Sequence, residues 1–119
     1  MKLEELQVYQ QAMNTGEEVW NIVMKWNYFD KETIGKQLIK AVDSIATNLS
    51  EGFGRFFYKE NKQFCYYSRG SLFETRTWRA KANNRTLIGN EQFRKFNDDL
   101  DFIGKKLNSY ISSIGKNPN

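Results

Sequence analysis

The sequence predicts an all-α protein, an antiparallel up-down-up-down four-helix bundle that forms one domain over residues 1–119. Three observations lead to this fold. The only proline is Pro118, so nothing interrupts long helices in the body of the chain. Apolar residues recur at spacings of three and four in four stretches, which is the helical period. The connections between these stretches are short, and short connections make neighbouring helices antiparallel.

The first helix is predicted at about residues 3–26. In it, Leu6, Met13 and Trp20 recur every seven residues, and further apolar residues widen this surface beyond one stripe. A helix that is apolar on more than one side packs against two neighbours. We therefore expect this helix to be covered on two sides.

The second helix is predicted at about residues 31–53. Asp30 precedes it as a plausible N-cap, and Gly52 and Gly54 are expected to close it, because glycine is common at helix C-termini. Six apolar residues repeat at spacings of three and four and form its expected buried side: Ile34, Leu38, Val42, Ile45, Leu49 and Phe53.

The third and fourth helices are predicted at about residues 59–83 and 91–115, with Asn90 as the cap of the fourth. The expected buried side of the third helix is Phe64, Tyr67, Ser71, Thr75, Trp78 and Ala82. The fourth helix has the most regular pattern, with spacings that alternate three and four like a heptad repeat. Its seam is Phe93, Phe96, Leu100, Ile103, Leu107, Tyr110 and Ile114.

Composition excludes several classes of function. The chain has no histidine, which removes Ser-His-Asp and Cys-His catalysis and the common metal sites. Its single cysteine, Cys65, lies between aromatic residues and is interpreted as small apolar filler. No segment is apolar enough to span a membrane or to act as a signal peptide. We therefore expect a soluble cytoplasmic protein that is not an enzyme and has no cofactor and no membrane partner.

The acidic residues of the fourth helix are a candidate cation site. Asp98, Asp99 and Asp101 are nearly consecutive, so their side chains point in different directions on a helix. They are interpreted as a solvated face, and no metal site is predicted.

Positive charge is concentrated in one part of the sequence. The net charge of the chain is +4, but residues 55–89 carry eight basic and two acidic residues and residues 1–54 carry five basic and eight acidic residues. Such a basic segment favours an anionic partner, although it is also compatible with a solvated face. The candidate phosphate contacts are Arg55, Lys59, Lys62, Arg69, Arg76 and Arg79.

Apolar residues are mixed into this basic side of the third helix and into the turn before it. A purely solvated face does not need them, so two alternatives stay open. They pack against another subunit, or their aromatic rings stack on nucleic-acid bases between phosphate-binding arginines. The candidate oligomer-interface residues are Phe56, Phe57, Tyr66, Leu72 and Phe73.

A second group of candidate residues is polar. Ser44, Asn48 and Glu51 share one side of the second helix, because they are spaced by four and three residues. Partly buried polar groups need partners, and the third helix offers candidates. A structural network that fixes helix register is the favoured interpretation, with a catalytic Glu51 as the alternative. The predicted members are Ser44, Asn48, Glu51, Arg69, Ser71 and Glu74.

Two motifs resemble a known family. The stretch from Ser44 to Arg55, SIATNLSEGFGR, is similar to the pattern S-I-P-x-N-I-x-E-G-x-G-R of bacterial four-helix-bundle proteins encoded in intervening sequences of 23S ribosomal RNA genes. Residues 69–75, RGSLFET, resemble the later R-G-S-L-x-E-x pattern of that family. Ala46 replaces the usual proline, which softens any kink there, and Phe57 replaces a helix-capping serine.

The resemblance implies an up-down bundle that assembles into a ring-like homopentamer. Accessory variability proteins of diversity-generating retroelements are related in fold and form similar basic pentamers that bind nucleic acid. Two functions are therefore expected as alternatives. The first is a homo-oligomer that binds nucleic acid, with structured RNA favoured over DNA. The second is a scaffold whose basic and aromatic rows contact other subunits or a protein from a neighbouring gene.

Overall fold

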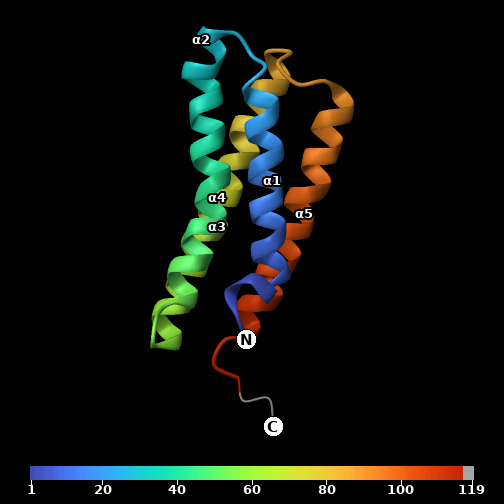
Figure 1. Ribbon diagram of the computed structural model, residues 1–119. Coiled ribbons are helices and arrows are strands. Elements are labelled where there is room, and N and C mark those ends of the chain that lie inside the picture. The colour runs from blue at the N-terminus through green and yellow to red at the C-terminus, as the bar shows by residue number, and fades with distance from the viewer. Residues whose placement is uncertain (117–119) are drawn as a thin grey trace.

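The chain folds as an antiparallel four-helix bundle, as the sequence predicts (Figure 1). A computed structural model describes residues 1–116, and its dimensions are 52 × 23 × 20 Å. All regular elements in this part of the chain are helical. They are η1 (Leu3–Glu5), α1 (Gln7–Val23), α2 (Tyr28–Asp30), the π-helical segment η2 (Lys31–Gly35), α3 (Lys36–Phe53), α4 (Tyr58–Asn84) and α5 (Asn90–Ser113).

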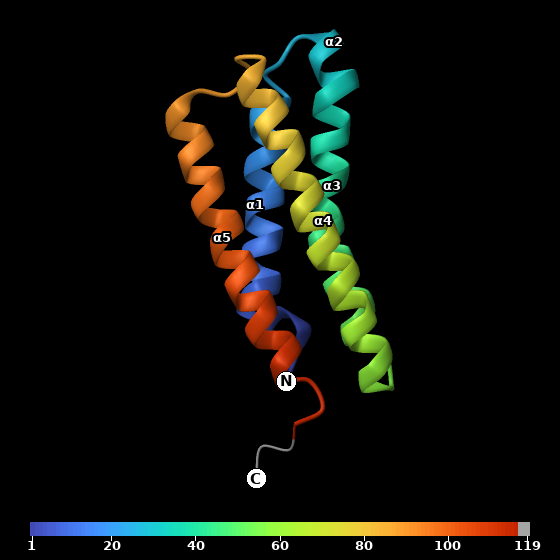
Figure 2. The same cartoon turned by 180° about the vertical axis from the view of Figure 1, so that it is seen from behind.

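The four long helices pack in the cyclic order α1, α3, α4, α5. Each therefore has two neighbours, which confirms the expectation for α1. The α1–α3 pair forms one side of the bundle and the α4–α5 pair forms the opposite side, as the two views show (Figures 1 and 2).

The N-cap of the second helical stretch, Asn27, lies three residues before the predicted N-cap, Asp30. Asn27 has an extended backbone, and its side-chain oxygen accepts a hydrogen bond from the Asp30 backbone N–H at 2.9 Å. The prediction that Asp30 caps this helix is therefore wrong: Asp30 lies inside the first turn, where its negative charge is favourable. Helix α5 begins at Asn90 with Gly89 in the capping position, so the prediction that Asn90 caps this helix is wrong by one residue.

A π-helical segment joins α2 to α3. It buries Ile34 and ends at Gly35, which lies against the end of α1. A Cβ atom added to Gly35 would lie 2.6 Å from Val23 Cγ1, closer than atoms can approach. Because Gly35 has no side chain, the segment that leads into α3 packs closely against the end of α1.

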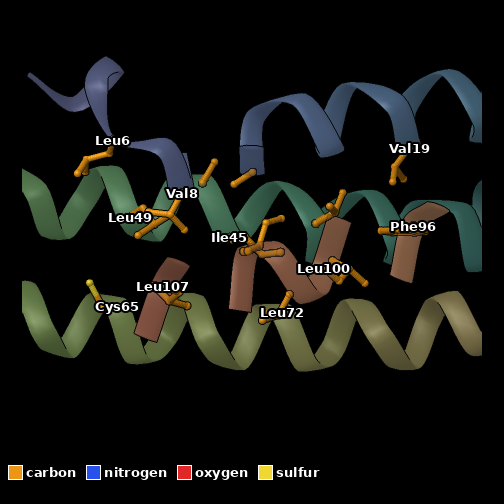
Figure 3. Close-up of a cluster of buried hydrophobic side chains, with 14 of the residues drawn as sticks. Leu6, Val8, Val19, Ile45, Leu49, Cys65, Leu72, Phe96, Leu100 and Leu107 are labelled. Atoms are coloured by element: carbon orange, nitrogen blue, oxygen red, sulfur yellow. The ribbon is translucent and has the colours of Figure 1, made fainter. Parts of the chain in front are cut away.

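The core follows the predicted seams of α3 and α5 (Figure 3). Ile45 and Leu49 of α3 and Leu100 and Leu107 of α5 are fully buried. Helix α3 continues through the buried Ala46, the position at which the family pattern has proline. The helical period therefore identifies the buried sides of these two helices correctly.

The buried side of α4 differs from the predicted one. Phe64 and Trp78 are only half-buried, and Tyr67 keeps 51% of its surface exposed. Thr75 and Ala82 of the predicted stripe are buried as expected, but the other residues that face the core lie beside it, because small side chains let α4 approach its neighbours closely. The buried residues of α4 are Cys65, Ser68, Leu72, Thr75, Arg79 and Ala82.

Helices α3 and α4 form the closest pair in the bundle. A Cβ atom added to Gly52 of α3 would lie 2.9 Å from both the Asn61 carbonyl oxygen and Phe64 Cβ of α4. The Ser68 hydroxyl donates a buried hydrogen bond of 2.8 Å to the Ile45 carbonyl of α3. The glycine of the family-like motif is thus required by helix packing. Its predicted role in closing α3 is not needed, since Gly52 lies inside the helix.

Candidate interaction surfaces

Two arginines of the predicted basic row lie in the groove between α4 and α5. Arg69 donates a hydrogen bond to the Asn108 side-chain oxygen at 2.7 Å, and its guanidinium lies 5.4 Å from the centre of the Tyr66 ring. Arg76 forms an ion pair with Asp101 at 2.8 Å. Both side chains are half-buried, so part of the row predicted to contact phosphates serves helix packing.

Arg79 extends the row into the interior, where only 9% of it is exposed. Its guanidinium lies 4.0 Å from the centre of the Phe93 ring and donates to the Asn97 side-chain oxygen at 2.8 Å. Its Nε atom has no hydrogen-bond partner. Burial, followed by repulsion from Arg76, lowers the pKa of Arg79. Arg79 is therefore a structural cation that cannot reach a phosphate on the surface.

The remaining predicted cations lie at the start of α4. Lys59 is exposed and Lys62 is half-buried, and neither makes an ion pair with any described residue. Arg55 is exposed and pairs with Glu51 at 2.9 Å. An exposed pair of this kind contributes little to stability, so Arg55 is available to a stronger anion.

A groove of about 750 Å³ opens between α4 and α5. Leu72 and Leu107 are the buried residues among those lining it, and Gly104 contributes no side chain at its position on α5. Arg69, Arg76 and Lys105 contribute positive charge, and Asp101 is its one acidic residue. The groove therefore combines apolar surface with an excess of cations.

The predicted polar network is smaller than expected. The Ser71 hydroxyl donates to the Ser44 hydroxyl at 3.0 Å, and the Asn48 amide donates to the same hydroxyl at 3.0 Å. This cluster links α3 to α4. The other three predicted members lie elsewhere: Glu51 pairs with Arg55, and Glu74 accepts a hydrogen bond from Trp78.

Arg69, the last of the predicted network residues, faces α5 and not α3. The prediction failed there because Arg69 lies on the opposite side of α4 from Ser71. Neither Glu51 nor Glu74 contacts the cluster, so the cluster contains no carboxylate among its hydrogen-bonded members. The alternative of a catalytic Glu51 receives no support from this arrangement.

Of the five residues predicted as an interface, the four aromatic ones lie on the surface and the leucine does not. Phe56 and Phe57 are exposed in the turn before α4 and make an edge-to-face contact with centres 5.0 Å apart. Tyr66 and Phe73 are also exposed. Leu72, in contrast, is buried in the core, because it lies on the true buried side of α4. It cannot be part of an exposed surface.

A further apolar surface lies on the outer side of α1. Met13 and Trp20 keep 44% and 48% of their surfaces exposed, and Met24 is similarly exposed one turn later. The seven-residue spacing predicts an apolar side of α1 that includes Met13 and Trp20, but it does not predict that this side stays exposed. The signal was the surplus of apolar positions on α1, which two neighbouring helices do not cover completely.

Two carboxylates interrupt this α1 surface. Asp43 of α3 approaches Gly16 of α1, where a Cβ atom would lie 2.7 Å from the carboxylate. Burial, followed by repulsion from Glu17, raises the pKa of Asp43. Neither Asp43 nor Glu17 forms an ion pair with any residue from 1 to 116. The α1–α3 side therefore holds carboxylates that lack a cation.

The cysteine and the acidic residues do not form a reactive centre in the described part of the chain. Burial raises the pKa of the Cys65 thiol to about 11, so it is protonated at neutral pH. No group of three or more potential metal-binding residues is found among residues 1–116. No helix in that range is long and apolar enough to cross a membrane.

The fold and these surfaces define a class of protein: a small all-α bundle whose distinctive features are open grooves and exposed aromatic residues. Comparison with known proteins makes the assignment more specific. The family model described as 23S rRNA-intervening sequence protein matches residues 4–109. The chain belongs to this family. No protein of curated function matches it.

A solved structure shares the fold. It is the crystal structure of a protein of unknown function from the S23 ribosomal protein family of Bacteroides thetaiotaomicron. The TM-score is 0.78 at 20% sequence identity, over 87% of this chain and 97% of that one. At this identity the similarity establishes the fold alone.

Proposed function

We propose that this protein is a non-enzymatic, self-associating bundle that binds nucleic acid, with structured RNA favoured, through cations on α4 and the turn before it. One observation supports this above the others: residues 55–89 have a net charge of +6, which is more than the charge of the whole chain. A local excess of cations attracts a polyanion and supplies phosphate contacts without sequence preference.

The basic residues differ in their contacts, and we assign them different tasks on that basis. Arg76 and Arg79 hold α4 against α5, so we assign them to folding. Lys59 and Lys62 carry charges without ion pairs, and we assign them to phosphate contacts together with Arg55. These three cations lie at the same end of α4 as the exposed Phe56 and Phe57, which can stack on unpaired bases.

Self-association would strengthen such binding. The family resemblance suggests a homopentamer, in which each cationic end would be repeated five times. Repetition raises the effective concentration of each site once the first is engaged, so weak contacts add up to useful affinity. A cytoplasmic complex with RNA or DNA is consistent with this proposal.

Fluorescence anisotropy with a labelled RNA hairpin tests the proposal. We expect the logarithm of the binding constant to fall linearly with the logarithm of the salt concentration. The double variant Lys59→Glu/Lys62→Glu should reduce that slope by about two, roughly one for each lost phosphate contact.

The matched control is Lys25→Glu/Lys36→Glu, which changes the net charge equally at exposed positions away from α4. It should retain most of the slope. Absence of binding at low salt, or an equal loss in both double variants, would refute the assignment to α4.

A protein-interaction scaffold is the second candidate. The α4–α5 groove favours it, because the groove offers apolar surface beside its cations. Phe73, which keeps 61% of its surface exposed, supplies apolar surface at its border, whereas Leu72 and Leu107 line it as buried residues of the core. This function predicts stable assembly without salt-dependent binding of RNA, so the same titration separates the two candidates.

A further inference from the structure

The bundle has open surfaces on both of its wide sides. The groove between α4 and α5 lies on one side, and the exposed stripe of α1, bordered by α3, lies on the other. Figures 1 and 2 show these two pairs of helices on opposite sides of the bundle. The two sides cannot meet within one molecule, because the core separates them. The groove of one copy can, however, meet the α1 stripe of a second copy.

The apolar features of the two sides complement each other in shape. On α1, Met13, Trp20 and Met24 follow spacings of seven and four, so they form a ridge along the helix. On the opposite side the α4–α5 groove is hollowed at Gly104, and Phe73 keeps 61% of its surface exposed at its border. A ridge of long side chains and a groove of about 750 Å³ are the two halves of a helix-packing contact.

The charges of the two sides complement each other at the Met13 end of the ridge. Glu17 and Asp43 lie there beside Met13 and form no ion pair with any described residue. Among the groove residues, Arg69 is bound to an uncharged amide and Lys105 has no ion pair with any described residue. The other end of the ridge, at Trp20 and Met24, is bordered by Lys31, Lys36 and Lys40, so the ion pairs of the contact belong to the Met13 end.

We propose that the α1 ridge of one copy, with Glu17 and Asp43 beside it, docks into the α4–α5 groove of a second copy. This inference rests on the self-association in the proposed function and identifies its two faces. The apolar ridge supplies buried area, and the ion pairs across the contact fix its register.

The contact joins unlike surfaces, so every copy has one ridge and one groove to offer. Such a heterologous contact closes into a ring when a whole number of rotations between neighbouring copies makes one full turn. Otherwise the assembly continues as a filament. Lys59 and Lys62 line neither groove nor ridge, so the cations assigned to nucleic acid remain accessible in the assembly.

Crosslinking between introduced cysteines tests the arrangement directly. Cys65 is fully buried and its thiol pKa is about 11, so the native chain offers no competing thiolate. The test variants are Met13→Cys on the ridge and Phe73→Cys at the groove, treated with a short bismaleimide. Co-expressed and purified together, they should give a covalent pair, whereas each variant alone should stay uncrosslinked.

Crosslinking of either variant by itself would show a contact between like surfaces and would overturn the proposal. A mixture that stays uncrosslinked would overturn it as well. If wild-type protein is monomeric by sedimentation at micromolar concentration, both this inference and the self-association in the proposed function fail.

A charge exchange provides the second test. Glu17→Lys and Lys105→Glu should each weaken assembly by about tenfold or more, because each places like charges across the contact. The variant with both exchanges should recover assembly, since the new lysine then meets the new glutamate of the next copy. Lys81→Glu, an exposed change on α4 outside the groove, is the matched control and should assemble normally.

The measurements separate this inference from the proposed function. If neither charge exchange affects assembly, the assignment of the contact to the α1 ridge and the α4–α5 groove is wrong, although self-association itself still holds. Crosslinking and rescue without salt-dependent RNA binding would support the two faces and refute the nucleic-acid function.

Discussion

Helices α4 and α5 are neighbours in the bundle, but their buried sides are built differently. The buried side of α5 consists of large apolar side chains: Phe96, Leu100, Ile103, Leu107 and Ile111. The buried side of α4 contains a cysteine, a serine, a threonine and an arginine beside its one leucine. The aromatic residues of α4, such as Tyr67 and Phe73, are largely on the surface instead.

This difference shows two ways in which a helix joins a core. Helix α5 contributes buried apolar area, which is the dominant favourable term in folding. Helix α4 contributes close approach and hydrogen bonds, such as that from Ser68 to the Ile45 carbonyl. Its larger side chains then remain available to other molecules. Burial of a helix and availability of its aromatic residues are therefore compatible.

The largest expected effect lies on the α5 side of this comparison. Leu100→Ala should lower the free energy of unfolding by about 2–5 kcal/mol, because Leu100 is fully buried and its removal leaves a cavity. Urea denaturation followed by circular dichroism measures the change. The control is Phe102→Ala on the exposed side of the same helix, which should cost less than about 1 kcal/mol. An equal loss of unfolding free energy in both variants would contradict the assignment of Leu100 to the buried side of α5.

The close approach of α4 to α3 is tested at the glycines. Gly52→Ala should lower the free energy of unfolding by about 1–3 kcal/mol, because the new methyl group would press on backbone and Cβ atoms of α4. Gly54→Ala is the control: its Cβ would lie 3.7 Å from the nearest atoms at a negative φ of −78°. It should be neutral or slightly stabilising. Thermal unfolding compares the two variants.

The hydrogen bonds of α4 should contribute less than its packing. Ser68→Ala removes the buried hydroxyl that bonds to Ile45 and should cost about 1 kcal/mol in the free energy of unfolding. Ser113→Ala removes an exposed hydroxyl at the end of α5 and should lie within about 0.5 kcal/mol of wild type. A cost at Ser68 equal to that at Leu100 would mean that the two helices do not differ as described.

The smallest effect is expected at the buried arginine. Arg79→Met keeps most of the aliphatic volume and removes a buried charge that has no carboxylate of its own. Because replacing a buried charge by an apolar residue is often neutral or stabilising, we expect a change within about 1 kcal/mol. Chemical denaturation at neutral pH measures it. A loss of several kcal/mol would show that the contacts of Arg79 to Phe93 and Asn97 dominate its role.

The sequence predicts the fold well, because the period of apolar residues reports burial directly where seams are large and aliphatic. The seams of α3 and α5 were identified on this basis. On α4 the same reasoning found Thr75 and Ala82 but missed residues such as Ser68, which is small enough to allow close packing and satisfies its hydroxyl on the backbone of α3. Hydrophobicity alone gives no signal for that arrangement.

The candidate surfaces were only partly predictable. Periodicity placed Arg69 and Arg76 on one side of α4 correctly, but it could not show that the partner of that side is α5, since partners depend on tertiary packing. The link between Ser44 and Ser71 was expected. The ion pair of Glu51 with Arg55 was not expected. A local contact between residues four apart competes with the longer-range partners that were considered for Glu51.

The π-helical segment before α3 has a consequence for how the end of the bundle is aimed. Each residue of an α-helix advances the direction of side chains by about 100° around the axis. Deleting one residue between Lys31 and Gly35 would let the helix run in regular α form and would swing Tyr28 and Phe29 around the axis by about that angle. The core residues of α3 would keep their places. The π-helical segment therefore sets the direction of Tyr28 and Phe29 independently of the packing of α3 in the core.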